Sequence, residues 1–567
     1  MSTTTTDVSW FHRVFPGLSL FTKYRRRWLR GDVLAGITVA AYLVPQVMAY
    51  ATIAGLPPVT GLWTVIPTFA IYGLLGSSRQ LSIGPESTTA LMTAATIGPL
   101  AAGDPVRYAA LSAALAIVVG LLCVVCWIGR LGFIADLFSR PILVGYMAGI
   151  ALIMIAGQLD KVTGVPVDGD GFVGEVTSFF GHITEYDLPT LIFGVFLIAL
   201  LFLFQWKWPR IPGPLLIVLL ATLLVHVFSL EEHGIEVIGP IPAGLPTPQL
   251  PGLHDMAGLI LPALGVLLVG YTDTILTARS FAAKNAHSID SNQEFLALGA
   301  ANVGAGLFQG FPISSSASRT ALGAAAGSRT QLYSWVALVC TLLVLLFAGP
   351  LLAEFPEVAL GAIVIFAAVR LIDLAGFRQL ARFRRNELAL ALVAFVGVLV
   401  FGILYGILFS VALSVAELLW RTARPHDAVE GFVPDLAGMH DVDDFPDAQT
   451  VPGLLVYRYD SPLFFANADN FRNRAMRAVD ENRPVRWFIL NAEANVEVDI
   501  TALAALEALR SDLERKGIRV GLARAKTELV ADLRAYGIIQ KIGEDMVFPT
   551  LPTAVEAYRE WVEDHPA

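Results

Sequence analysis

Residues 309–320 combine side chains that could bind a small anion at membrane depth. The stretch opens with Gly310-Phe-Pro312, which cannot continue a helix, and then supplies four serines and Arg319 between hydrophobic segments. Proline and hydroxyl groups are typical of a helix N-terminus, where unpaired backbone N–H groups attract anions. A charged side chain costs about 2.5–3.5 kcal/mol at this depth. We therefore predict a short helix whose first turn and arginine face an anion.

Two carboxylates could accompany this site. Asp273 lies inside an apolar segment, where a carboxylate is by default a functional candidate. It could hold a proton, or bind sodium with the hydroxyl of Thr277 one turn later, or form a salt bridge that lets Arg319 be buried. Glu86 follows Gly84-Pro85 and could either cap a helix or accept a proton that makes anion uptake electrically neutral.

Further polar residues occur in the same hydrophobic context. Gln46 and Tyr50 are one helical turn apart. Ser87 and Thr88 follow Glu86 at the start of one predicted span, and the serines within 314–318 lie just before Arg319 at the start of another. Two helix N-termini, one arginine and no surplus of carboxylates favour a small anion over a cation. No aromatic cluster suited to stacking a base accompanies them, which argues against a nucleobase.

The composition indicates the elements that must hold these residues. The chain of 567 residues is 55% hydrophobic and 15% charged, whereas soluble proteins average about 25% charged residues. We expect a polytopic membrane protein with three parts: a cytoplasmic N-terminal segment (1–30), a transmembrane domain (31–424), and a linker with a cytoplasmic soluble domain (425–567). The first segment is polar, aromatic and basic, which does not fit a cleavable signal peptide.

Hydropathy and basic residues together predict fourteen membrane spans, with both termini in the cytoplasm. This count places almost all loop arginines and lysines on the cytoplasmic side and the long loops 160–187 and 230–254 outside. The apolar run 387–421 is divided near Gly402 and Gly406. The spans are 33–54, 60–77, 85–101, 107–128, 138–158, 188–206, 211–229, 256–278, 294–308, 315–327, 331–350, 357–373, 387–403 and 405–421.

Fourteen spans allow two halves of seven, and an odd repeat unit must be inverted in the membrane. Polar interruptions occur at matching places. Pro45 in span 1 and Pro85 opening span 3 are 40 residues apart, and Asp273 in span 8 and Pro312 opening span 10 are 39 apart. Such paired interruptions indicate a substrate site near the membrane midplane.

The soluble part alternates short apolar strands with amphipathic helices. Strands are expected at 451–459, 485–491 and 518–523, and helices at 467–482, 501–516, 528–536 and 553–562. This pattern predicts a small α/β domain with a central sheet. The sequence contains no glycine-rich phosphate loop and no metal-ligand cluster, so we expect no cofactor, no metal and no enzymatic activity.

Several stretches resemble the signature of the SulP family of sulfate permeases. These are residues 41–51 with the following Gly55-Leu-Pro57 and Gly61-Leu-Trp63, and Ser82-Ile-Gly-Pro85, 290–299 and 311–320. The C-terminal domain is similar to the STAS domain, which this family shares with anti-sigma-factor antagonists. The resemblance covers nearly the whole chain and is strongest to actinobacterial, sulfate-transporter-like members.

The resemblance implies a UraA-like fold in which a core domain (spans 1–4 and 8–11) moves against a gate domain (spans 5–7 and 12–14), commonly in a homodimer. Substrate would lie between the starts of spans 3 and 10. The implied binding residues are Gln46, Tyr50, Pro85, Glu86, Ser87, Thr88, Ser316, Ala317, Ser318 and Arg319.

The resemblance also bears on coupling and regulation. Arg319 resembles the basic residue of the animal sulfate, chloride and motor-protein branch, whereas Asp273 and Thr277 are similar to cation ligands of the sodium-bicarbonate branch. The STAS antagonist motif is Asp-Ser-Ser-Gly, but this chain has Asp499-Ile-Thr-Ala502. Because Ile500 cannot be phosphorylated, we expect no such switch, and we expect Thr501 to be a helix N-cap.

Together these observations predict a secondary active transporter of the cytoplasmic membrane that carries sulfate with protons by alternating access. Sodium-coupled bicarbonate transport and proton-coupled C4-dicarboxylate transport are alternatives. So are a passive anion channel and a membrane sensor that signals through its STAS domain.

Overall fold

The computed structural model describes residues 15–18, 24–133, 139–167, 169, 171–208, 213–239, 244–252, 257–284 and 287–565. Much of the expected N-terminal segment 1–30 therefore lies outside the described residues. The chain divides into two compact units, Met1–Ser414 and Val415–Ala567.

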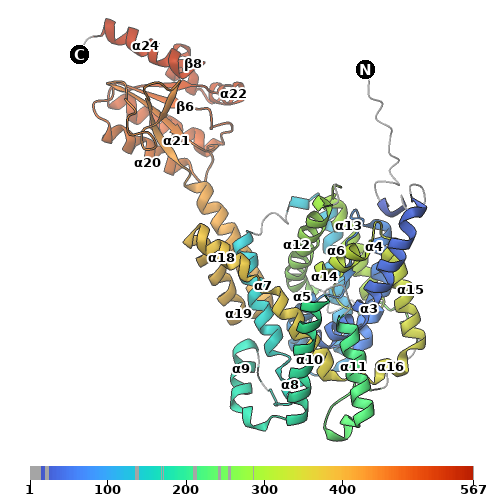
Figure 1. The fold of residues 1–567 in the computed structure, drawn as a ribbon. Helices are drawn as coiled ribbons and strands as arrows, with labels where there is room; N and C mark the ends of the chain where they lie inside the picture. Colours follow the sequence, from blue (N-terminus) through green and yellow to red (C-terminus); the bar gives the residue numbers. More distant parts are fainter. Residues whose placement is uncertain are drawn as a thin grey trace. The chain divides into compact units, whose positions relative to one another are not determined.

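The first unit is helical (Figure 1). The helices at the predicted spans are α3 (Leu29–Ile53), α4 (Pro58–Leu75), α5 (Ser87–Ala101), α6 (Pro105–Ile128), α7 (Arg140–Ala156), α10 (Leu188–Lys207), α11 (Gly213–Phe228), α12 (Ile260–Lys284), α13 (Ser291–Leu307), α14 (Ala317–Ala326), α15 (Leu332–Phe347), α17 (Glu357–Leu371) and α19 (Arg385–Ala423), whose last residues belong to the second unit. The other helices are α8 (Leu159–Thr163), α9 (Gly171–Gly181), α16 (Gly349–Ala353) and α18 (Leu374–Phe383).

Each of the predicted spans coincides with one of these helices, and the last two coincide with the two parts of α19. Among the described residues, seven helices are long and apolar enough to cross a membrane, and α7, α11 and α15 are shorter apolar helices. Within α19, Gly402 has a φ of 74° and interrupts the helix, as the sequence predicted. A left-handed backbone of this kind strongly favours glycine.

Two very short strands lie before the half-length helices. Strand β1 (Ile83–Gly84) leads into α5, and β2 (Ser314–Ser315) leads into α14. They pair antiparallel, with Ile83 opposite Ser315 and Gly84 opposite Ser314. An antiparallel pair is what a repeat inverted in the membrane predicts for equivalent segments of the two halves.

The other two predicted interruptions do not break their helices. Helix α3 continues through Pro45, and α12 continues through Asp273. A proline removes only one backbone hydrogen bond and can be accommodated within a membrane helix when its neighbours satisfy the freed carbonyl. The polar side chains at these places therefore project from continuous helices.

Helix α3 packs against both half-helices, α5 and α14, and α6 and α12 pack against α5. Helix α13 packs along α6 and α4, and α15 packs along α3 and α4. Small residues allow close approach: a Cβ on Gly120 of α6 would lie 2.6 Å from the Gly299 carbonyl oxygen of α13. This fits the small-residue interfaces of membrane helices.

The second unit contains a six-stranded sheet in the order β4-β3-β5-β6-β7-β8. Strands β5 to β8 are parallel, and β3 and β4 are antiparallel additions. The strands are β3 (Asp427–Phe432), β4 (Met439–Asp441), β5 (Leu454–Tyr459), β6 (Trp487–Asn491), β7 (Arg519–Ala523) and β8 (Val547–Phe548), and the helices are α20 (Ala468–Glu481), α21 (Ile500–Arg515), α22 (Thr527–Ala535), α23 (Ile538–Ile542) and α24 (Leu551–Asp564).

The sheet is covered on both faces. Leu455 and Phe488 belong to a core with α20 and α21, whereas Leu454 and Trp487 belong to a core with α24. Burial on both faces explains the continuously apolar strands. Strands β3, β4 and β8 were not predicted.

One prediction in this unit was wrong. The N-cap of α21 is Asp499, whose carboxylate accepts a hydrogen bond from the Ala502 N–H, and not Thr501. Aspartate is among the best N-cap residues, so the helix begins one residue earlier, at Ile500, and Thr501 lies exposed in its first turn.

Candidate functional site

The starts of α5 and α14 are tied together directly. The Ser316 N–H donates to the Ser82 carbonyl oxygen over 2.8 Å, and the Ser82 N–H donates to the Thr320 hydroxyl over 3.0 Å. The break before α14 is fixed by Asn302, whose side-chain oxygen accepts from the Ile313 N–H at 3.0 Å. Two helix N-termini from opposite halves of the repeat therefore converge on one place, as predicted.

Arg319 occupies this place and is fully buried (0% exposed). Its Nη1 donates to Oε1 of Gln46 at 3.1 Å and lies 3.7 Å from Oε2 of Glu86. Its Nε donates to Oγ of Ser82 at 3.4 Å. The guanidinium thus joins span 1, the start of span 3 and its own half-helix.

Glu86 occupies the N-cap position of α5, but its side chain forms no capping hydrogen bond there. Its carboxylate accepts from the Ser87 hydroxyl at 3.2 Å and pairs with Arg319. Of the roles that the sequence left open, capping is therefore not observed. Thr88 is buried in the first turn of α5, and Pro85 is buried between β1 and that helix.

Helix α3 contributes Gln46 and Tyr50, as expected. The Gln46 Nε2 donates to the Tyr50 hydroxyl at 2.9 Å, which fixes the side-chain oxygen of Gln46 toward Arg319. Both residues are buried. At the start of α14, the Ser316 and Ser318 hydroxyls are 3.1 Å apart, and Ala317 is exposed.

Several polar atoms of this cluster have no hydrogen-bond partner within the described chain, although they are buried. They include Nη2 of Arg319, Oε2 of Glu86 and the hydroxyls of Ser314 and Ser315. Buried polar groups are nearly always satisfied by protein, water or ligand. Donors left unsatisfied beside a buried positive charge are suited to an anion with several acceptor oxygens.

Asp273 lies near this cluster without joining it. Helix α12 packs against β2 and α5, and a Cβ on Gly270 would be 3.4 Å from Cβ of Ser314. Asp273, one turn along, is half-buried and within electrostatic reach of Glu86. Arg319 pairs with Glu86 and not with Asp273. Thr277 is half-buried a further turn away.

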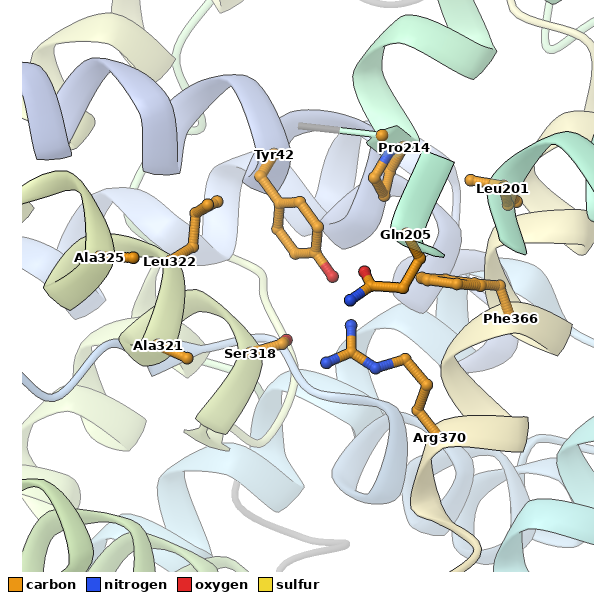
Figure 2. A pocket seen from close by; sticks show the side chains of 11 residues that line it. Tyr42, Leu201, Gln205, Pro214, Ser318, Ala321, Leu322, Ala325, Phe366 and Arg370 are labelled. Atoms are coloured by element: carbon orange, nitrogen blue, oxygen red, sulfur yellow. The ribbon is translucent and has the colours of Figure 1, made fainter. Parts of the chain in front are cut away.

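A cavity of about 280 Å³ adjoins the start of α14 (Figure 2). Tyr42 of α3 and Ser318 of α14 line one side, and Gln205 of α10 and Arg370 of α17 line the other. Figure 2 shows the Tyr42 hydroxyl, the Gln205 amide and the Arg370 guanidinium pointing toward one another. Polar groups of spans 6 and 12 thus face those of spans 1 and 10.

Most residues of the buried cluster can be predicted from the sequence, but most of the residues around it cannot. Tyr42 precedes Gln46 by one turn, as Gln46 precedes Tyr50, so the helical period could have identified it. Ser82, Gln205 and Arg370 gave no such signal, because they come from a loop and from two helices whose packing cannot be derived from one sequence.

These features define a class of protein: a polytopic membrane transporter fold in which two opposed half-helices form a central site, followed by an α/β domain. Residues 29–394 match the Sulfate permease family, and residues 445–554 match the STAS domain. The chain therefore belongs to the sulfate permease family and carries a C-terminal STAS domain.

Individual relatives agree along the whole chain. The sequence is 57% identical over 562 residues to a probable sulfate transporter of Mycobacterium tuberculosis, covering 99% of this chain and 100% of the relative. It is 31% identical over 571 residues to the probable sulfate transporter 3.3 of Arabidopsis thaliana, covering 96% and 90%.

Solved structures show the same fold. The inward-facing murine anion transporter solute carrier 26 family member A9 matches with a TM-score of 0.90 and 22% identity, over 99% of this chain and 96% of that one. The transmembrane domain of a cyanobacterial bicarbonate transporter matches with a TM-score of 0.61 and 23% identity, over 69% and 99%.

Proposed function

We propose that this protein is a secondary active transporter of sulfate, which binds between the starts of α5 and α14. The observation that carries this proposal is the fully buried Arg319, whose Nη2 is unsatisfied in the described chain although it lies between two helix N-termini. A buried charge is costly unless it is paired. An anion would complete the pairing that Glu86 alone provides at 3.7 Å.

The chemistry of the cluster suits a tetrahedral oxyanion. Sulfate carries two charges and accepts several hydrogen bonds, and Arg319, the hydroxyls of Ser314 to Ser318 and the free N–H groups of the helix starts are donors. The relatives named as sulfate transporters support sulfate over other anions.

Asp273 is the group that we assign to proton coupling. Glu86 already has a positive partner in Arg319, whereas no hydrogen bond or ion pair of Asp273 is found among the described residues. An unpaired carboxylate at membrane depth is costly, so binding a proton stabilises it. Protons carried with sulfate would also offset the charge of the anion.

In an alternating-access mechanism, the cavity beside the start of α14 would lie between the two moving domains. Its one side belongs to the expected core domain (α3 and α14), and its other side belongs to the expected gate domain (α10, α11 and α17). Movement of one domain against the other would open or close this space. We further propose that the protein is a homodimer in the cytoplasmic membrane. Both termini would lie in the cytoplasm, because the basic loops favour that side.

Uptake of labelled sulfate into proteoliposomes tests this function. Wild type should take up sulfate at least about fivefold faster with an acidic outside than without a gradient, and an inward sodium gradient should have no effect. Uptake of bicarbonate driven by sodium, or an ohmic anion current without coupling, would contradict the proposal.

Asp273→Asn tests the coupling role in the same assay. Because the amide cannot exchange a proton, the stimulation by the pH gradient should disappear while sulfate exchange between preloaded vesicles continues. Asp273→Glu is the control and should keep the stimulation. A normal response to pH in Asp273→Asn would move the coupling role to Glu86.

A further inference from the structure

A second basic pocket lies at the opposite end of α14 from Arg319. It has a volume of about 480 Å³, and its lining includes Arg27, Trp28, Arg79 and Arg329. Pockets of ~300–1,000 Å³ are typical of small-molecule sites. Nothing in the proposed transport mechanism uses these residues.

The pocket has a rigid floor. A Cβ on Gly31 would lie 2.5 Å from the Gly327 carbonyl oxygen, and Gly327 itself has a φ of +101°. This close approach brings the start of α3 against the end of α14. The Gln80 side-chain amide donates to the Ser328 carbonyl oxygen at 2.7 Å. The Tyr333 hydroxyl donates to the backbone carbonyl oxygen of Gln80 at 2.8 Å.

The arginines of this pocket lack acidic partners. Within the described residues, Arg27, Arg79 and Arg329 form no ion pair with a carboxylate. Asp32 lies nearby, but it is fully buried and accepts hydrogen bonds from the Arg329 N–H at 2.6 Å and from the N–H and hydroxyl of Thr330. One of its oxygens therefore accepts from backbone N–H groups, and the other accepts from the hydroxyls of Thr330 and Tyr24.

The start of the first membrane helix adds to this positive character. The 3-10 turn η2 (Arg26–Trp28) continues directly into α3, and neither has a side-chain N-cap. The free N–H groups of such a helix start carry partial positive charge. Trp28 is followed in the chain by the exposed Leu29 and Leu34, and tryptophan is typical of the membrane–water interface.

We propose that this pocket binds a phosphate group, either in the headgroup of an anionic phospholipid or as free phosphate. Three guanidinium groups can bind phosphate oxygens in pairs, and basic pockets at the cytoplasmic membrane surface attract anionic lipid headgroups. A bound phosphate bridges Arg79, which precedes β1, and Arg329, which follows α14. It thereby fixes the segment that leads to β1 and the segment that follows α14, the helix that carries Arg319.

Binding to the purified full-length protein tests this site. The probes are short-chain phosphatidylglycerol, phosphatidylcholine of the same chain length, and inorganic phosphate, each followed by the shift in thermal stability with concentration. The pocket variant is Arg79→Gln with Arg329→Gln. The control is Arg26→Gln with Arg30→Gln, which removes the same charge from neighbouring residues that do not line the pocket. All measurements are repeated with Arg319→Gln to exclude the transport site.

We expect phosphatidylglycerol to bind at least about tenfold more tightly than phosphatidylcholine. The affinity of the pocket variant for phosphatidylglycerol should fall at least about tenfold, and the affinity of the control variant should stay within about twofold of wild type. If inorganic phosphate also binds saturably, and this binding depends on Arg79 and Arg329, the site accepts free phosphate as well as the lipid headgroup. If inorganic phosphate does not bind while phosphatidylglycerol does, the site is specific for the lipid headgroup. Absence of saturable binding by both probes, or equal affinities in the pocket and control variants, overturns the proposal. Sulfate binding at Arg319 should persist in the pocket variant, so the two sites fail independently.

Discussion

At the scale of single residues, the site is organised by what surrounds Arg319. Gln46 accepts from its guanidinium, and Tyr50 in turn holds Gln46. Glu86 lies on the other side at 3.7 Å, a distance that leaves the arginine incompletely paired. The arrangement keeps a positive charge buried while leaving donor capacity for a ligand.

Tyr50→Phe should weaken sulfate binding about fivefold, since a lost neutral hydrogen bond costs about 1 kcal/mol. Without the Tyr50 hydroxyl, the Gln46 amide can turn away from Arg319. The measurement is the sulfate dissociation constant of the purified protein. Tyr108→Phe is the matched control, because that hydroxyl donates to the Ala54 carbonyl oxygen outside the site; an equal loss in both variants would mean a general structural effect.

The sequence alone identified Arg319, Gln46, Tyr50 and Glu86 because polar residues are conspicuous inside apolar spans. It offered Asp273 as a salt-bridge partner of Arg319, whereas the structure pairs Arg319 with Glu86. Whether Asp273 or Glu86 pairs with it depends on how β1 and β2 align, and the register of two-residue strands gives no periodic signal. Arg370 and Gln205 were missed because their positions relative to Arg319 depend on how the helices pack.

At the scale of elements, the two half-helices are held by buried polar contacts as well as by packing. Glu294 in the first turn of α13 is fully buried. It accepts hydrogen bonds from the N–H and hydroxyl of Ser77, the N–H of Ser78 and the hydroxyl of Tyr72. It fixes the end of α4 and the segment that leads to β1.

Glu294→Ala should therefore destabilise the membrane unit strongly. Each buried donor left without a partner costs about 1–3 kcal/mol, so a loss of at least about 3 kcal/mol is expected, seen as a fall in Tm of at least about 5 °C. The exposed Glu354→Ala is the control and should change Tm little. A Tm equal to that of the control would show that these hydrogen bonds do not hold the segment.

At the scale of the whole molecule, the residues assigned to the sulfate site all lie in the first compact unit, Met1–Ser414. Composition predicted two modules, because charge rises sharply after residue 424, and the compact units divide at Ser414 and Val415. It could not reveal β3 and β4, which add an antiparallel edge to the sheet and lie in a segment interrupted by Gly431, Pro434 and Gly438.

Truncation after residue 424 should leave sulfate affinity within about threefold of the full chain, since the STAS domain supplies none of the proposed ligands. The measurement is equilibrium binding of labelled sulfate by protein that elutes as a single species. Loss of binding in a well-behaved truncated protein would mean that the STAS domain completes the site.

The most direct measurement of the central claim is the sulfate dissociation constant of Arg319→Gln compared with wild type. Glutamine removes the charge and its charge-assisted hydrogen bonds, which contribute about 1.5–3 kcal/mol each. Affinity should fall at least about 30-fold, with the purified variant still eluting as a folded protein. Unchanged affinity for sulfate in folded Arg319→Gln would contradict a transport site built around this arginine.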